Sequence, residues 1–185
     1  MSQTPPRSEP AGLTTPARCV TSTPSPLETF LQASVGRWVS ERRYLALPSG
    51  RIETVCTRLT IEPLHEGDAS LRFLATAHGL ERPLYRGLHI HWTSKRSNGA
   101  VQTGSTALAV NGMVMLRDRS FFSPEPIQAS CELEGQRLVI QLSLGKDHIE
   151  EDCRLINPNL RTRQTVVRRS GREVMLGQYL ETRLS

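Results

Sequence analysis

The sequence has little of what marks a metalloprotein, a redox enzyme or a membrane protein. Its four cysteines, Cys19, Cys56, Cys131 and Cys153, are widely spaced and form no Cys-x-x-Cys pair. This spacing argues against a zinc ribbon or a thioredoxin-type site and is typical of a reducing compartment. No apolar run reaches the length of a membrane span, and no signal peptide with an apolar centre opens the chain. We therefore expect a soluble, cytoplasmic protein that does not associate with membranes.

Familiar catalytic motifs are missing as well. The chain contains no Walker loop, no Gly-x-Gly-x-x-Gly and no Ser-His-Asp arrangement, so the sequence indicates neither a nucleotide site nor a hydrolase triad. His89 and His91 alternate onto one face of a predicted strand. A metal site needs a third ligand, however, and no spacing in the sequence suggests one. We therefore expect no metal site.

Lysine is almost absent, because Lys95 and Lys146 are the only two among 23 basic residues. The other 21 are arginines, whose planar forks suit carboxylates and phosphates and stack on conjugated rings. A genome rich in G and C would also inflate arginine without any function. The net charge of +5 favours nucleic acid, an anionic ligand or an acidic partner. Aromatic residues make up only 5%, which argues against a nucleic-acid surface, where aromatic and basic residues interleave.

The composition divides the chain into a tail and one domain. Residues 1–24 are rich in Ser, Thr and Pro and nearly lack large apolar side chains. Such a segment cannot bury enough surface to offset its ordering entropy, so we predict a disordered tail, with a plastid transit peptide as the less favoured alternative. Residues 25–185 are long enough to form one domain with a sizeable core.

One short helix is predicted at the start of the domain. Ser25, Pro26 and Glu28 have the pattern of an N-cap, a first helical proline and a capping-box glutamate. Apolar residues on one face follow, and Gly36 can end the helix. So short a helix is marginal alone, and we expect it to lie across one end of a barrel.

After Gly36 the sequence reads as a series of short strands, with turn signals of two to four residues in many of the connections. The predicted strands are Trp38–Leu47, Arg51–Ile61, Ser70–Ala77, Leu84–Thr93, Thr103–Val110, Met113–Arg117, Ile127–Leu133, Leu138–Leu144, Ile149–Leu155, Leu160–Val167 and Glu173–Leu184. Regular short strands of this kind indicate an antiparallel meander, and closure removes its exposed edges. We predict an all-β, lipocalin-like up-and-down barrel of about ten strands, which can enclose one small ligand.

The segment from Asn157 to Thr165 carries the pattern that matters most for function. After Pro158, which disfavours helix, the chain alternates so that Arg161, Arg163 and Thr165 project from one face of a strand. Two arginines placed in this way can grip two carboxylates of one ligand. The alternative is a solvated strand surface decorated with arginine.

Four segments, in this order, resemble segments of the CpcS/CpeS phycobiliprotein lyases. They are Phe30–Arg43 with Gly36, Trp38, Ser40 and Arg42 in register; Met115-Leu116-Arg117-Asp118 followed by Phe121; Glu151 followed by Pro158–Arg163; and the ending Glu181-Thr182-Arg183. The resemblance extends from Leu27 to Arg183. It implies a lipocalin-like barrel that binds an open-chain tetrapyrrole, such as phycocyanobilin or phycoerythrobilin, as its substrate and not as a cofactor.

The resemblance also implies a reaction, a setting and partners. The bilin would be attached through a thioether to a cysteine of an apo-phycobiliprotein subunit, in the cyanobacterial cytosol during assembly of the thylakoid-associated phycobilisome. A homodimer, or a heterodimer with another S/U-type lyase subunit, is a further expectation. A non-catalytic carrier of bilins or other amphipathic anions remains the alternative function.

The resemblance and the chemistry of a bilin together suggest roles for particular residues. Arg161 and Arg163 are first choice, and Arg42 second, for the two propionates. Glu181 is assigned the pyrrole nitrogens and acid–base influence on the addition, with a plain salt bridge to Arg183 or a neighbouring strand as the alternative. Further candidates are Glu151, which would orient the arginines, and Trp92, Tyr179 and Met175, which would line the apolar part of the pocket.

The turn between the last two strands tests the placement of Glu181. A two-residue turn at Ser170 and Gly171 makes Arg161 face Leu180 and turns Glu181 to the other side of the sheet. A three-residue loop that includes Arg169 puts Glu181 on the arginine face. The predicted site needs the second geometry, or a bulge that compensates for the first.

Overall fold

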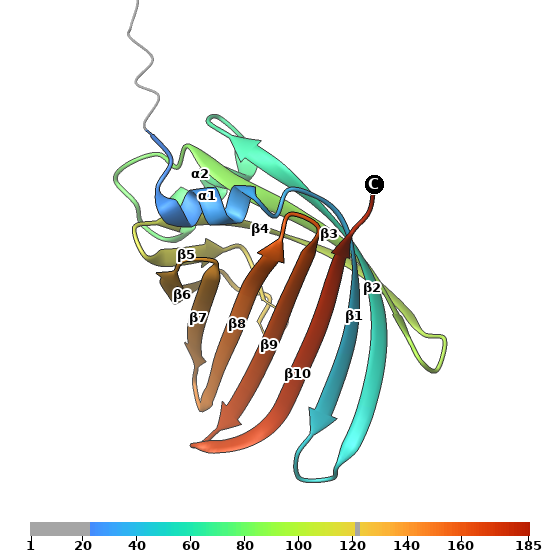
Figure 1. The fold of residues 1–185 in the computed structure, drawn as a ribbon. Helices are drawn as coiled ribbons and strands as arrows, with labels where there is room; N and C mark the ends of the chain where they lie inside the picture. Colours follow the sequence, from blue (N-terminus) through green and yellow to red (C-terminus); the bar gives the residue numbers. More distant parts are fainter. Residues whose placement is uncertain (1–22, 121–122) are drawn as a thin grey trace, which may run out of the picture.

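The computed structural model describes residues 23–120 and 123–185. The predicted disordered tail falls almost entirely outside these residues, as does Phe121. Within the described residues the chain forms two short helices and ten strands (Figure 1). Neither helix of these described residues is long and apolar enough to cross a membrane.

The ten strands form a closed antiparallel barrel in which each pairs with its neighbours in sequence and the first closes onto the last. The strands are β1 (Gly36–Ala46), β2 (Arg51–His65), β3 (Arg86–Arg96), β4 (Val101–Asn111), β5 (Val114–Arg117), β6 (Ile127–Glu134), β7 (Arg137–Leu144), β8 (Asp147–Asn157), β9 (Leu160–Arg169) and β10 (Arg172–Arg183). The predicted lipocalin-like, up-and-down barrel is confirmed. Closure pairs both edges of the sheet and so removes the surface on which another chain could add a strand.

Helix α1 (Pro26–Gln32) begins as the sequence predicts and lies across one end of the barrel (Figure 1). Ser25 Oγ accepts a hydrogen bond from the amide of Glu28, and the Glu28 carboxylate accepts one from the amide of Ser25. Leu27, Phe30 and Leu31 point from the helix into the barrel and join its core. The helix therefore closes this end with apolar side chains.

A second helix, α2 (Ala69–Ala77), replaces the strand predicted over Ser70–Ala77, and that prediction is wrong. Leu71 and Leu74, three residues apart, are both buried, while Phe73 is half exposed. In a strand Leu71 and Phe73 would share a face, but a helix puts Leu71 beside Leu74. The helix packs on the outer wall, where the side chains of Leu64, Ala107, Ala109 and Leu116 cover its apolar face.

The register between β9 and β10 depends on a bulge. Ser170 and Gly171 both have positive φ and form a two-residue turn, so the three-residue loop that the site was expected to need is absent here. The register then shifts between Glu173 and Met175, and from there Glu181 lies directly opposite Arg161. An extra residue on one strand reverses which side chains share a face. The bulge thus puts Glu181 on the arginine face.

Candidate functional site

The barrel encloses a cavity of about 490 Å³ that opens away from α1. This volume lies within the range of small-molecule sites. Near α1 the wall is apolar, with Phe30, Leu31 and Leu88 among its residues. Toward the far end it becomes polar, with Arg51 and Arg96 at the mouth. The interior can therefore take a ligand that is apolar along its body and charged elsewhere.

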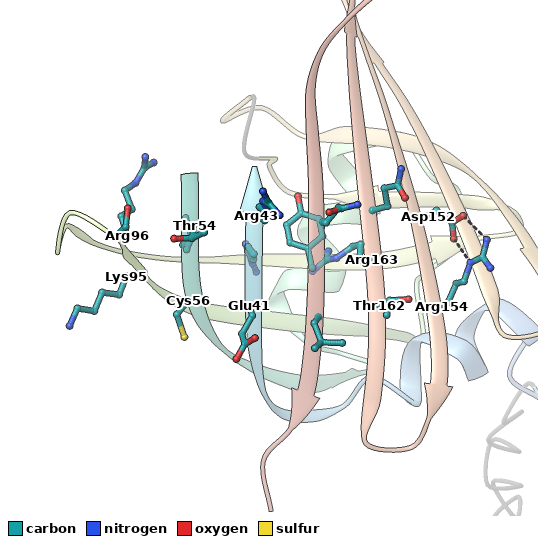
Figure 2. Close-up of a pocket in the computed structure, with 17 residues that line it drawn as sticks. Glu41, Arg43, Thr54, Cys56, Lys95, Arg96, Asp152, Arg154, Thr162 and Arg163 are labelled. Carbon is teal, nitrogen blue, oxygen red and sulfur yellow. Dashed lines mark hydrogen bonds and ion pairs between the residues drawn. The ribbon is translucent and has the colours of Figure 1, made fainter. Parts of the chain in front are cut away.

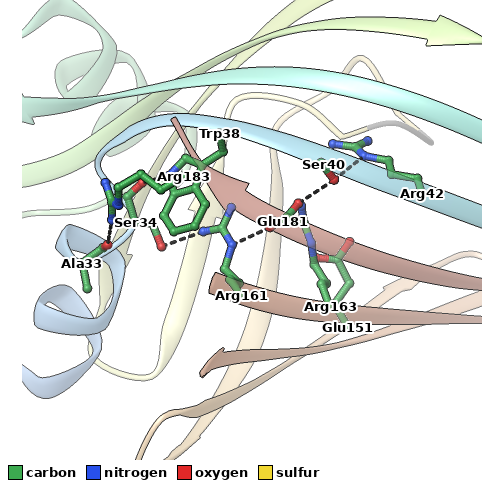
Figure 3. A network of polar contacts seen from close by, with 10 residues as sticks. All are labelled: Ala33, Ser34, Trp38, Ser40, Arg42, Glu151, Arg161, Arg163, Glu181 and Arg183. Atoms are coloured by element: carbon green, nitrogen blue, oxygen red, sulfur yellow. Dashed lines mark hydrogen bonds and ion pairs between the residues drawn. The ribbon is translucent and has the colours of Figure 1, made fainter. Parts of the chain in front are cut away.

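A buried polar network runs along one wall of the barrel (Figure 3). Arg161 donates from Nε to Glu181 Oε2 and from Nη1 to Ser34 Oγ, the latter over 2.8 Å. Arg163 Nη2 lies 2.8 Å from Glu181 Oε1, and the Ser40 hydroxyl donates to the same oxygen over 2.9 Å. One carboxylate thus holds two guanidinium groups from the neighbouring strand.

Glu181 is ionised and completely enclosed. Its side chain has no exposed surface, and it lies behind the residues that line the cavity. Burial alone would raise the pKa of Glu181, but Arg163 and Arg161 outweigh that effect and lower the pKa to about 2. A carboxyl group with so low a pKa holds no proton at neutral pH. The geometry therefore favours Glu181 as a residue that positions arginines.

The two arginines of β9 differ in what they can offer a ligand. Arg161 is 5% exposed, stacks its guanidinium 4.7 Å from the centre of the Trp38 ring, and ties the end of α1 to the barrel. Arg163 lies further along the cavity, where Glu151 is 3.7 Å from its Nη1. Burial would lower the pKa of Arg163, but Glu181 and Glu151 raise it well above its usual value. Arg163 is thus the better placed of the two to meet a ligand.

Arg117, on β5, is a cavity residue that the sequence reasoning did not assign to the site. It lines the interior across from β9, and no ion pair involves it within residues 23–120 and 123–185. Burial lowers the pKa of Arg117, and Glu151 acts in the opposite direction. Arg117 lies two residues after the inward-facing Met115 on the same strand, so the two side chains share a face. This spacing could have shown that Arg117 faces the cavity.

Two buried guanidinium nitrogens of residues that line the cavity lack a protein hydrogen-bond partner. Among the described residues these are Arg117 Nε and Arg163 Nε. Buried polar groups in proteins are nearly always paired, and an unpaired one costs about 1–3 kcal/mol. Two such donors around one cavity are suited to a ligand that brings acceptor oxygens.

Two thiols in the barrel interior are poor nucleophiles. Cys131 and Cys153 are free and buried in the barrel core, and Cys153 lines the cavity. Burial raises the pKa of Cys131 to about 11 and also raises the pKa of Cys153. The thiolate is the reactive form of cysteine, so neither side chain is set up to capture an electrophile at neutral pH.

Comparison with known proteins identifies the family of the chain. The family described as CpeS-like protein matches residues 26–184. The chain belongs to the CpeS-like family. The resemblance that the sequence motifs indicated is thereby confirmed at the level of the family.

Two curated proteins and two solved structures resemble this CpeS-like protein. The proposed phycocyanobilin lyase CpcS 2 of Nostoc sp. is 34% identical over 84% of this chain and 89% of its own. The proposed chromophore lyase CpcV of Picosynechococcus sp. is 34% identical over 91% of this chain and 87% of its own.

Among solved structures, the S-type phycobiliprotein lyase CPES of Guillardia theta has a TM-score of 0.71 at 20% identity, covering 86% of this chain and 93% of that one. A protein of unknown function from the DUF3598 family of Nostoc punctiforme has a TM-score of 0.53 at 16% identity, covering 83% of this chain and 49% of that one. At these identities the likeness concerns the fold.

The fold brings most of the predicted site residues to one cavity of this CpeS-like protein. Arg42, Arg161, Arg163, Glu151, Thr165, Tyr179, Trp92 and Met175 all line it, and Glu181 lies directly behind. Arg42 Nε donates to Ser40 Oγ over 3.0 Å. The Arg42 and Arg163 guanidinium groups lie 5.4 and 5.1 Å from the centre of the Tyr179 ring. Arg183 does not pair with Glu181; its guanidinium donates to the carbonyl oxygens of Pro158, Val35 and Ala33. The other alternative, an ion pair of Glu181 with a neighbouring strand, is present through the two arginines of β9.

Trp92 lies on β3 against Gly104 of β4, and this contact yields a prediction. A Cβ atom at Gly104 would lie 2.4 Å from Trp92 Cζ2, so Gly104→Val must displace the indole. We expect the variant to shift tryptophan fluorescence and lower the free energy of unfolding by about 1–3 kcal/mol. Bilin binding should weaken with it. Thr103→Val, on the outward face of the same strand, should leave all three unchanged.

A second hollow, of about 1000 Å³, lies on the outer wall across six strands (Figure 2). Glu41, Arg43 and the free Cys56 line it, each next in sequence to a cavity residue and on the opposite face. Asp152 and Arg154 pair within it over 3.3 Å. Its lining is largely charged and includes Arg42, Arg163 and Tyr179, which also line the interior cavity. The interior cavity has the more extensive apolar wall, so it is the better site for a conjugated ligand.

Proposed function

We propose that this CpeS-like protein is a phycobiliprotein chromophore lyase. It would bind an open-chain tetrapyrrole inside its barrel and deliver it to a cysteine of a phycobiliprotein subunit, where a thioether forms. Two relatives that are named as phycocyanobilin and chromophore lyases support this proposal. The alternative is a carrier that binds bilin without transferring it.

The observation that carries the proposal is the pair of unpartnered guanidinium nitrogens at a cavity that also has an extensive apolar wall. A bilin has two propionates, four pyrrole-type nitrogens and a long conjugated face. Arg117 Nε and Arg163 Nε can donate to propionate oxygens. Apolar side chains toward α1, with Trp92, match the rings. Each class of group on the ligand therefore meets its complement.

The buried network suggests a separate role for each charged residue. Glu151 lines the cavity beside Arg163, so we assign it the pyrrole N–H groups. Glu181 would hold Arg163 and Arg161 in place from behind. Arg42 follows Ser40 by two residues on β1, toward the mouth of the cavity, and would contact the part of the bilin that emerges there. Arg161 would support the site chiefly by joining it to α1.

The chemistry requires little from the lyase itself. The acceptor's cysteine sulfur forms a bond to the exocyclic double-bond carbon of the first bilin ring, and the thiol's proton ends on the bilin. This addition needs no oxidant, reductant or leaving group. The barrel would hold one conformer and present that ring at the mouth, which favours one attachment site and one stereochemistry. Because Cys153 is protonated, the bilin is not trapped on the lyase.

Incubation with phycocyanobilin and an apo-phycobiliprotein subunit tests the proposal. We expect absorbance of the bilin to shift on binding, and a covalent adduct to appear on the subunit and not on the lyase. Mass spectrometry of each denatured chain, with zinc-enhanced fluorescence of the gel band, measures the adduct. Binding without an adduct, in the presence of each candidate subunit and of a second S/U-type lyase chain, would identify a carrier instead.

A further inference from the structure

The outer wall of the barrel carries a cluster of metal-ligating side chains that is unrelated to the cavity. Glu62 on β2 pairs in register with His89 on β3, and His91 follows two residues later on the same face. Their sequence neighbours Ile61 and Ile90 point inward to the core and cavity. The sequence spacing supplies only two ligands, and folding brings Glu62 to them from the adjacent strand.

We propose that Glu62, His89 and His91 form a binding site for a divalent transition-metal ion on the outside of the barrel. One ligand atom from each residue lies within 4.8 Å of the others. His91 Nε2 is 3.7 Å from Glu62 Oε2, and the two imidazole rings have centres 4.1 Å apart at 51°. Three groups of the right chemistry therefore already converge on one point.

Only small side-chain rotations separate this cluster from a closed site. In a tetrahedral zinc site with bonds of about 2.1 Å, neighbouring ligand atoms lie about 3.4 Å apart. The side chains of Glu62 and His91 are 60% and 48% exposed, so both can rotate without disturbing the core. The backbone needs no change, because the pairing of β2 with β3 has no register shift between the Val55–Arg96 pair and the cluster.

The ligand set indicates which ions the site would take. Two imidazoles and one carboxylate suit zinc, cobalt, nickel or copper, whereas calcium and magnesium prefer oxygen ligands throughout. Three protein ligands leave a fourth tetrahedral position open, as in catalytic zinc sites. Because the site faces outward, that position is open to water or to a side chain of another protein.

Calorimetric titration of the bilin-free, untagged full chain with Zn²⁺ tests the proposal. Bilins bind zinc themselves, so bilin must be absent. We expect one tight equivalent per chain, and at least a ten-fold weaker affinity in His89→Ala and in His91→Ala, since loss of even an outer-shell partner costs about 10–100-fold. Glu62→Gln should weaken binding too. Co²⁺ should bind with the visible absorption of a low-coordinate site in the wild type only.

His148→Ala, which removes a histidine on β8, is the matched control and should leave the affinity unchanged. Melting temperatures in EDTA should agree across all variants, which separates lost ligands from lost fold. Absence of a tight equivalent, or equal affinity in His89→Ala and the wild type, would overturn the site. Bilin binding should not change in any of these variants, so the result is independent of the proposed lyase function.

Discussion

Glu181→Gln should lower the free energy of unfolding by about 3–5 kcal/mol, because it removes the charge that compensates two buried arginines. Within the described residues Arg161 has no other carboxylate partner, and Arg163 keeps only the more distant Glu151. Glutamine preserves the size of the side chain, so the loss reports charge and not a cavity. Urea denaturation followed by circular dichroism measures the change.

The same interaction predicts a particular pH dependence. The pKa of Glu181 falls from its ordinary 4.5 to about 2 on folding, which corresponds to about 3 kcal/mol. Because the folded pKa is the lower one, this stabilisation is fully present above about pH 4.5 and is lost as the pH falls toward 2. The difference between the wild type and Glu181→Gln should therefore shrink across that window.

Glu41→Gln is a matched control, since Glu41 is exposed on the outward face of the strand that pairs with β10. A surface substitution of this kind should change stability by less than about 0.5 kcal/mol. If Glu181→Gln were equally mild, or if its deficit persisted unchanged down to pH 2, the carboxylate would not be the buried counter-ion described above.

The sequence predicted the barrel well because strand patterns and turns are local. Alternation along each strand and the capping box at Ser25 depend on residues within a few positions of each other, and both are found. Helix α2 was missed because its local sequence pattern is ambiguous. Leu71, Phe73 and Leu74 fit a strand or a helix in isolation, and only packing against Leu64 of β2 decides between them.

The site was less predictable because it depends on register and on distant pairs. The bulge near Glu173 changes which face Glu181 occupies, yet no residue type marks it in the sequence. Arg117 lines the cavity only because closure of the barrel turns that face of β5 inward. Glu62 meets two histidines only through the β2–β3 pairing. The sequence placed the arginines of β9 together, but it could not show that Glu181 pairs with both of them, whereas Arg117 has no ion pair within the described residues.

That distinction makes Arg117 the sharpest test of the cavity. Arg117→Leu should weaken phycocyanobilin binding by about 10- to 100-fold, the value of a hydrogen bond to a charged group. Stability should stay the same or rise, because the guanidinium is buried without an ion pair and an apolar side chain avoids its desolvation. Bilin absorbance titration and urea denaturation of the same preparation measure the two effects.

Three further variants isolate the cause. Arg58→Leu removes an exposed arginine from the outward face of β2 and should change neither quantity. Arg163→Leu should reduce both, because Arg163 faces the cavity and also neutralises Glu181. Arg117→Lys keeps the charge but loses the fork, and we expect intermediate affinity.

The contrast between Arg117 and Arg163 is what separates a ligand site from a structural ion-pair network. Removal of a guanidinium that only supports the fold should lower the stability of the protein, whether or not bilin is bound. Removal of a guanidinium that pairs only with a ligand carboxylate should lower bilin affinity and leave stability unchanged. Unfolding of Arg117→Leu comparable to that of Glu181→Gln, or wild-type bilin affinity in Arg117→Leu, would place the propionates elsewhere, with Arg42 and Arg51 at the mouth as the next cations to test.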